Sequence, residues 1–397
     1  MGNDNQNTNF WQRLPLWVWG LLPLVLLLLV VSLFFLANPL AFFTGNFPPL
    51  ETLTIQQIRF PGQNQVELTA INGGPDPVSI AQVIVDDAYW QFNIEPATPL
   101  GRLQQATITM NYPWVDGEPL TIALITDTGA TFASEVPVAV ASPGVDLTTF
   151  IVFGLLGIYV GIIPVGLGML WFPFMRRVDR KWTHAFLALT IGLLVFLLVD
   201  TVLEALEMAE ELPGVFQGVP VVFFAMLLTL LVLLAISRRR GQQSPLDLAT
   251  MIALGIGLHN LGEGLAIGAA FATGLAALGS FLVIGFTLHN ITEGIGIVAP
   301  LMRGGQVAWR SFFYLAALAG APAILGTWIG GFAFNPLLAV LFLSIGAGAI
   351  LQVIWEVGKL LARESSAEGE ATLSWLNFAS VVAGILIMYV TAFLVSG

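Results

Sequence analysis

Nine stretches of apolar residues constrain this chain more than any other feature, because each is long enough to cross a lipid bilayer. A spanning helix needs roughly 20 apolar residues, at about 1.5 Å rise per residue, to cross about 30 Å of hydrocarbon. Hydrophobic residues make up 56% of the 397 and charged residues 10%, whereas a soluble domain carries about 25% charged residues. The sequence therefore predicts a polytopic α-helical membrane protein embedded in the lipid bilayer, with spans at 14–38, 147–174, 183–208, 219–237, 247–273, 278–302, 310–332, 336–361 and 373–395.

The first span predicts an N-terminal anchor helix within residues 1–44. One basic residue, Arg13, precedes it, and its apolar run is longer than the apolar region of about 7–15 residues in a signal peptide. We therefore expect an uncleaved signal anchor. Whether the helix is cleaved stays open at this point.

The distribution of basic residues predicts the orientation of the spans, because short cytoplasmic loops collect Lys and Arg. When nine spans begin from an inside N-terminus, only Arg59 and Arg102 of the 14 basic residues fall outside. The C-terminus and the segment after the first span are then also outside.

Residues 45–146 differ from the rest and predict a separate extracytoplasmic domain. Runs such as 65–71 and 106–110 alternate between apolar and polar residues, and turn signals such as 72–75 bound them, which is typical of β-strands. Seven to eight such runs indicate an all-β, immunoglobulin-like sandwich. The segment holds 11 acidic and two basic residues and no histidine. Its acidic surface serves solubility or concentrates cations weakly.

Charge and cysteine content exclude several kinds of partner. The formal net charge of −11 argues against a nucleic acid as partner, because a protein binds the phosphates of nucleic acid through clustered Lys and Arg. Because the chain has no cysteine, it has neither a disulfide framework nor a thiolate metal site.

Two matching motifs within the predicted spans provide the candidate site. They read His-Asn-Leu-Gly-Glu-Gly over 259–264 and His-Asn-Ile-Thr-Glu-Gly over 289–294, 30 positions apart, and they hold two of the three histidines. Helical spacing of i and i+4 places His259 with Glu263 and His289 with Glu293. The helix rise puts the two histidines about 18 Å and about 16 Å into their spans, near the midplane.

Imidazole nitrogen and carboxylate oxygen suit Zn²⁺, Fe²⁺, Mn²⁺ or Co²⁺. The side-chain oxygens of Asn260 and Asn290 are available to a second, neighbouring ion. Ionisable groups at this depth are costly and mark functional sites. The alternative is a satisfied polar cluster that only joins helices, and two copies at matched depth favour the metal site over it. Glycines around both motifs allow close helix packing.

Further acidic residues lie in other spans. Asp200 and Glu204, with Glu207, follow helical spacing toward the outside and predict an acidic entry to the transport path; the alternative is a charged helix end at the interface. Glu356 either joins the site or pairs with Lys359 at the inner interface. Asp200 and Glu356 each follow a glycine by eight residues in oppositely directed helices, a weak signal of an inverted repeat.

On these residues the sequence resembles the ZIP family of metal-ion transporters, and within it the bacterial ZupT-like members. The resemblance covers roughly 147–397 and rests on the paired His-Asn-x-x-Glu-Gly motifs, together with the Ala-Gly-Ala run at 347–349 followed by Glu356. It implies an eight-helix core with an inverted repeat and an elevator-like movement of one helix block.

The resemblance also implies roles for individual residues. His259, Glu263 and Glu293 would be metal ligands, with His289 joining them, and Asn260, Asn290 and Glu356 would contribute to a second ion site. Two features depart from the family: the loop from Arg238 to Pro245 is short and has no histidine, and residues 1–146 are additional to the core.

The sequence thus predicts a multi-pass transporter that takes up divalent transition-metal cations, Zn²⁺ first, into the cytoplasm across the plasma membrane. Fe²⁺, Mn²⁺, Co²⁺ and Cd²⁺ stay open as cargo, as do a homodimer, the energy coupling and the partner of the sandwich. An enzyme is not expected, because the His-Glu-x-x-His motif of zinc proteases is absent. The alternatives are an intramembrane metal-dependent hydrolase and a membrane receptor that binds its partner through the outer sandwich.

Overall fold

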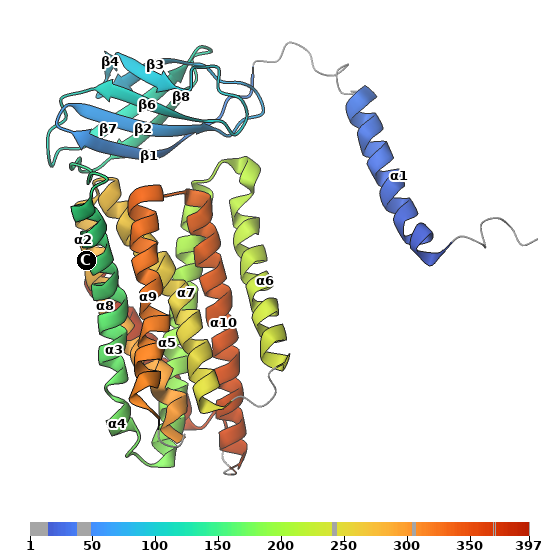
Figure 1. The fold of residues 1–397 in the computed structure, drawn as a ribbon, viewed down its shortest axis with the longest axis vertical. Helices are drawn as coiled ribbons and strands as arrows, with labels where there is room; N and C mark the ends of the chain where they lie inside the picture. The colour runs from blue at the N-terminus through green and yellow to red at the C-terminus, as the bar shows by residue number, and fades with distance from the viewer. Residues whose placement is uncertain are drawn as a thin grey trace, which may run out of the picture. The chain divides into compact units, whose positions relative to one another are not determined.

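The chain divides into two compact units, Met1–Leu50 and Glu51–Gly397. The computed structural model describes residues 15–37, 49–239, 244–303, 307–367, 369 and 371–396 (Figure 1). Arg13 lies outside these residues, as does most of the loop between Arg238 and Pro245.

The described part of the first unit contains one helix, α1 (Leu16–Ala37). Apolar side chains are exposed on all its sides from Leu21 to Leu36, which is the pattern of a helix surrounded by lipid or by protein. Its described apolar stretch, Leu21–Ala37, is shorter than those of the eight spans in the second unit. Of the nine predicted spans, the described residues therefore support eight at full length.

The second unit begins with eight strands in two antiparallel sheets. The sheet orders are β1-β2-β6-β5 and β4-β3-β7-β8. Inward-facing residues of both sheets, such as Leu68 on β2 and Leu124 on β7, are fully buried in one shared core, as the predicted alternation requires. The strands are β1 (Leu53–Gly62), β2 (Gln65–Asn72), β3 (Ile80–Val85), β4 (Ala88–Trp90), β5 (Phe92–Glu95), β6 (Gln105–Asn111), β7 (Leu120–Thr126) and β8 (Thr131–Val136).

The rest of this unit is a bundle of helices. They are α2 (Leu147–Gly157), η3 (Ile158–Ile162), α3 (Ile163–Met169), α4 (Phe172–Met175), α5 (Arg180–Glu210), η4 (Gly214–Phe216), α6 (Gly218–Arg239), α7 (Pro245–Ala272), α8 (Ala276–Val298), η5 (Ala299–Arg303), α9 (Trp309–Ala333), α10 (Pro336–Ala367) and α11 (Trp375–Ser396). With α2 to α4 counted as one segment, eight are long and apolar enough to cross a membrane. They match the eight spans predicted after residue 146 and indicate a multi-pass membrane protein.

Helix α7 is the centre of the bundle. In α7, 83% of the apolar stretch is buried, whereas the corresponding share for the span that contains α6 is 6%. Helix α7 begins with a capping box, in which the Ser244 side chain accepts from the Asp247 backbone N–H at 3.2 Å and the Asp247 carboxylate accepts from the Ser244 N–H at 3.0 Å. Two of its glycines, Gly257 and Gly264, lie directly against backbone carbonyls of α9. The predicted close approach of helices at the motif glycines is confirmed.

Candidate metal centre

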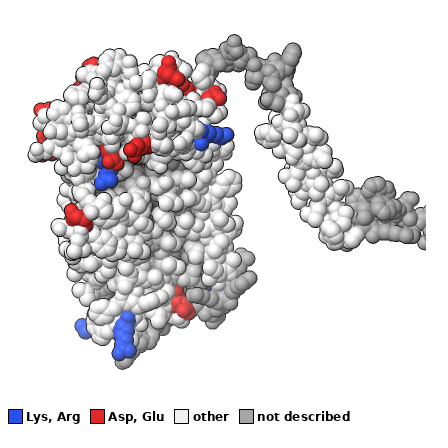
Figure 2. Space-filling view, turned by 45° about the horizontal axis from the view of Figure 1, so that its top comes forward, with Lys and Arg blue, Asp and Glu red and all other residues white. Residues whose placement is uncertain are grey.

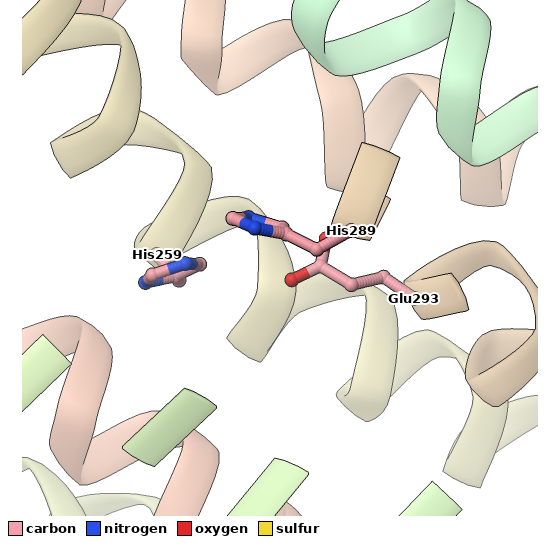
Figure 3. Close-up of side chains that lie close together, drawn as sticks. All are labelled: His259, His289 and Glu293. Carbon is pink, nitrogen blue, oxygen red and sulfur yellow. The ribbon is translucent and has the colours of Figure 1, made fainter. Parts of the chain in front are cut away.

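Helices α7 and α8 carry the His, Asn and Glu residues of the two motifs, and each of these six is buried. The exposed fraction of their side chains ranges from 0% for Glu263 to 8% for His289. Figure 3 shows His259 on one helix facing His289 and Glu293 on another. The helical spacing predicted from the sequence therefore brings the two motifs together in the interior of the bundle.

The ligand atoms of both helices converge on one point. His259 Nε2 lies 2.9 Å from Glu263 Oε1, and His289 Nε2 makes an even shorter contact with the same oxygen. Candidate ligand atoms of His259, His289 and Glu293 all lie within 4.8 Å of one another. Glu263 thus contacts both imidazoles, and Glu293 places a second carboxylate beside them.

A residue of α5 fixes the tautomer of His259. The hydroxyl of Thr201 donates its only hydrogen to the Leu197 carbonyl at 2.8 Å, and it also lies 2.9 Å from His259 Nδ1. Since that hydrogen is already used, Thr201 accepts a hydrogen bond from Nδ1–H. With this proton held on Nδ1, a cation at the centre would meet the lone pair of Nε2, which faces the other candidate ligands. This is the arrangement of a metal-binding histidine whose second nitrogen is held by a neighbour.

Both asparagines are oriented through their amide groups. Asn260 Nδ2 donates to the Ala319 carbonyl at 3.0 Å, and Asn290 Nδ2 donates to the Val160 carbonyl at 3.0 Å and to Glu263 Oε2 at 3.1 Å. The Val160 carbonyl is available because its α-helical partner four residues on would be Pro164, which has no N–H. The π-turn η3 includes this position.

Four buried oxygen acceptors at the centre have no hydrogen-bond donor within hydrogen-bonding geometry among the described residues. They are Asn260 Oδ1, Asn290 Oδ1 and both carboxylate oxygens of Glu293. A buried acceptor without a donor costs about 1–3 kcal/mol, and native structures rarely keep several together. A polar cluster that only joins helices would pair these atoms, whereas a divalent cation satisfies oxygens directly. The donor set therefore fits a cation.

The two acidic residues predicted for the transport path lie one helical turn apart on α5. Asp200 is next to Thr201 in the chain, and the Thr201 hydroxyl lies 2.9 Å from His259 Nδ1. Asp200 is exposed and Glu204 is half-buried. They are therefore placed between the metal centre and the end of α5 that terminates at Glu210.

Glu356 does not belong to this cluster in the structure. Its Oε1 accepts from Ser237 Oγ of α6 at 2.9 Å, and its Oε2 forms an ion pair with Lys359 Nζ at 2.9 Å. The structure does not place Glu356 at the predicted second ion site. It shows the alternative, the ion pair with Lys359. The reason is helical direction, because Gly346 of α10 packs against His259 and ten further residues carry Glu356 about 15 Å along the axis.

Sequence reasoning missed two polar residues. Thr201 contacts the centre, but nothing in its local sequence distinguishes it from the other threonines of the spans; its position after Asp200 was the only signal. His184, the third histidine of the chain, is fully buried, and its Nε2 lies 3.8 Å from Glu364 Oε2 of α10. It remains apart from the metal centre.

Compared with models of known protein families, the chain matches none.

Proposed function

We propose that the chain transports divalent transition-metal cations, with Zn²⁺ as the first candidate, through the centre on α7 and α8. One observation carries the proposal: His259, Glu263, His289 and Glu293 converge inside a membrane-spanning bundle, beside buried oxygens that have no donor. A cargo ion must be held by several ligands and then released. A centre near the midplane of the bilayer provides such a stopping point.

The ligand chemistry limits the cargo to a class. Two imidazole nitrogens and two carboxylates suit Zn²⁺, Fe²⁺, Mn²⁺, Co²⁺ and Cd²⁺ alike. Asn260 Oδ1 and Asn290 Oδ1, with Glu293, are suited to a second ion next to the first. Asp200 and Glu204 would attract cations toward the centre from the side of Glu210.

Glycine contacts divide the helices into two blocks, which supports alternating access. The first block consists of α2 to α4, α7, α8 and α9. Within it, a Cβ added at a glycine between two helices would collide with the backbone of the neighbouring helix. The second block, α5, α6, α10 and α11, shows the same close backbone approach. Examples are Gly264 against Ala323, Gly294 against Val165, Gly192 against Val381 and Gly348 against Met226.

Contacts between the two blocks are longer. The nearest backbone atom to a Cβ added at Gly346 of α10 is His259 Cα at 3.2 Å, whereas the four examples within the blocks lie 2.1–2.4 Å from a backbone carbonyl oxygen. A Cβ added at Gly255 would meet a methyl group of Val353 at 3.0 Å, and one at Gly296 would meet a methyl group of Thr190 at 3.1 Å. Side chains can rearrange when helices slide, whereas interlocked backbones cannot. The first block carries all four ligands, so we propose that it moves as a unit past the second, in the elevator-like manner of the ZIP transporters that the motifs resemble.

The same proposal covers the surroundings of the core. The charge distribution places the ends of α4 and α10 in the cytoplasm of a plasma-membrane protein, with the sandwich and the C-terminus outside. The sheet orders β1-β2-β6-β5 and β4-β3-β7-β8 correspond to the A-B-E-D and C′-C-F-G arrangement of immunoglobulin-like domains. We propose that the sandwich belongs to this type.

Uptake of zinc into proteoliposomes or cells tests the proposal. We expect His259→Ala to abolish accumulation and His184→Ala, the same change at a buried histidine outside the centre, to retain it. Competition experiments among the five metal ions then rank them by preference as cargo. Accumulation by the His259→Ala variant at the wild-type rate would refute metal transport through this centre.

A further inference from the structure

A groove lies at the surface of the first block. Helices α3 and α4 and the start of α9 form it, and its volume is about 510 Å³. Apart from Arg176 and Arg177, its lining residues are apolar or aromatic.

The groove has apolar walls and a basic mouth. Arg176 and Arg177 follow the end of α4, both are exposed, and the Arg176 guanidinium lies over the Phe172 ring, 5.9 Å from its centroid. No acidic residue is among the lining residues of the described chain. Basic side chains stand out at the end of the helical bundle in Figure 2. An occupant must therefore combine a long apolar part with a negative charge at one end.

The dimensions of the groove match one leaflet. From Gly166 to Arg177 the chain advances eleven residues and from Trp309 to Ala316 seven, which corresponds to roughly 10–16 Å along the helix axes. One leaflet contributes about 15 Å of hydrocarbon. The apolar walls therefore extend from the membrane interface about as deep as an acyl chain.

Two small residues leave the space that forms the groove. A Cβ added at Gly166 would meet nothing within 4 Å, and Ala316 of α9 also lines the groove. Two aromatic residues stand at its edge, since Trp309 is 69% exposed and Phe313 is 74% exposed. Tryptophan is enriched at the level of lipid headgroups.

We propose that this groove binds an anionic membrane phospholipid. Its phosphate group lies against Arg176 and Arg177, and one acyl chain runs along Gly166 toward Ala316. Basic pockets between spanning helices bind anionic headgroups in this way, and the charge of the mouth excludes a purely apolar occupant. The inference is independent of metal transport, because it uses none of the metal ligands.

Native mass spectrometry of the purified full-length chain tests the site with two lipids of equal acyl length, phosphatidylglycerol and phosphatidylcholine. Each arginine near the surface contributes about fivefold to the binding of an anionic lipid, so we expect about a 30-fold preference for phosphatidylglycerol. The double variant Arg176→Gln, Arg177→Gln should lose this preference, and the control Arg363→Gln on α10 should keep it.

A groove-filling variant separates loss of the lipid from loss of the fold. Gly166→Leu should reduce the retention of both lipids, whereas Gly358→Leu, at another helical glycine with open space around it, should not. Equal retention of the two lipids by the wild type, unchanged retention in Gly166→Leu, or crosslinking of Phe313 between two copies in the membrane would overturn the proposal.

Discussion

The hydrogen bond between Thr201 and His259 offers the sharpest test of the metal centre, because it crosses from one helix block to the other. Thr201→Val replaces the hydroxyl by a methyl group of nearly the same size. His259 Nδ1–H then loses the Thr201 hydroxyl, which lies 2.9 Å away, inside a site where His259 is 2% exposed. A buried donor left without a partner costs about 1–3 kcal/mol.

That cost is expected to appear in the affinity for metal. Without Thr201, the His259 proton gains by moving to Nε2, where it reaches Glu263 but blocks the ligand position. Loss of a partner that holds a metal-binding histidine typically lowers affinity by about 10–100-fold, in agreement with the cost above. We expect a decrease of this size in zinc affinity, measured by calorimetric or dye-competition titration of the purified protein.

Two controls distinguish this role from a general loss of packing. Thr201→Ser keeps the hydroxyl and should bind zinc like the wild type. Thr190→Val removes another buried hydroxyl of α5, one that bonds only to the Phe186 carbonyl, and should leave zinc affinity unchanged. Wild-type affinity in Thr201→Val, or an equal loss in Thr190→Val, would refute the assignment of the tautomer.

Three further predictions concern a glycine contact between helices, the carboxylate of Glu356 and a tyrosine of the sandwich. Gly264→Ala should lower stability by about 1–3 kcal/mol, because its methyl group would overlap a backbone carbonyl of α9, whereas Gly296→Ala should lower it less; equal melting temperatures would contradict the division into blocks. Glu356→Gln should leave zinc affinity unchanged, since the carboxylate is engaged elsewhere, and a large loss in the same titration would return this residue to the ion site. Burial and a hydrogen bond to Asp86 raise the pKa of Tyr112 to about 12, so its contribution to stability is full below pH about 10, the pKa of an unfolded tyrosine, and disappears as the pH rises to about 12. A phenolate absorbance titration should show this midpoint, and Asp86→Asn should lower it.

The sequence alone determined the elements and the core of the candidate site. A membrane span depends on the apolarity of about 20 consecutive residues, and the eight spans after residue 146 are where this rule places them. Strand alternation in 65–71 and 106–110 and the i, i+4 pairing of His259 with Glu263 are equally local. Each depends on neighbours in the chain, so it could be predicted without knowing which helices pack together.

Only the tertiary structure decided which distant groups serve the centre. Thr201 is 58 positions from His259, and the Val160 carbonyl that orients Asn290 is 130 positions away. Glu356 was expected at the site, but its axial position on α10 places its carboxylate next to Ser237 and Lys359 instead. Such contacts depend on the rotation and axial position of whole helices. The rotation and axial position of a helix depend on its packing along its whole length, mainly at glycines that allow two backbones to touch. A motif of six residues therefore cannot predict them.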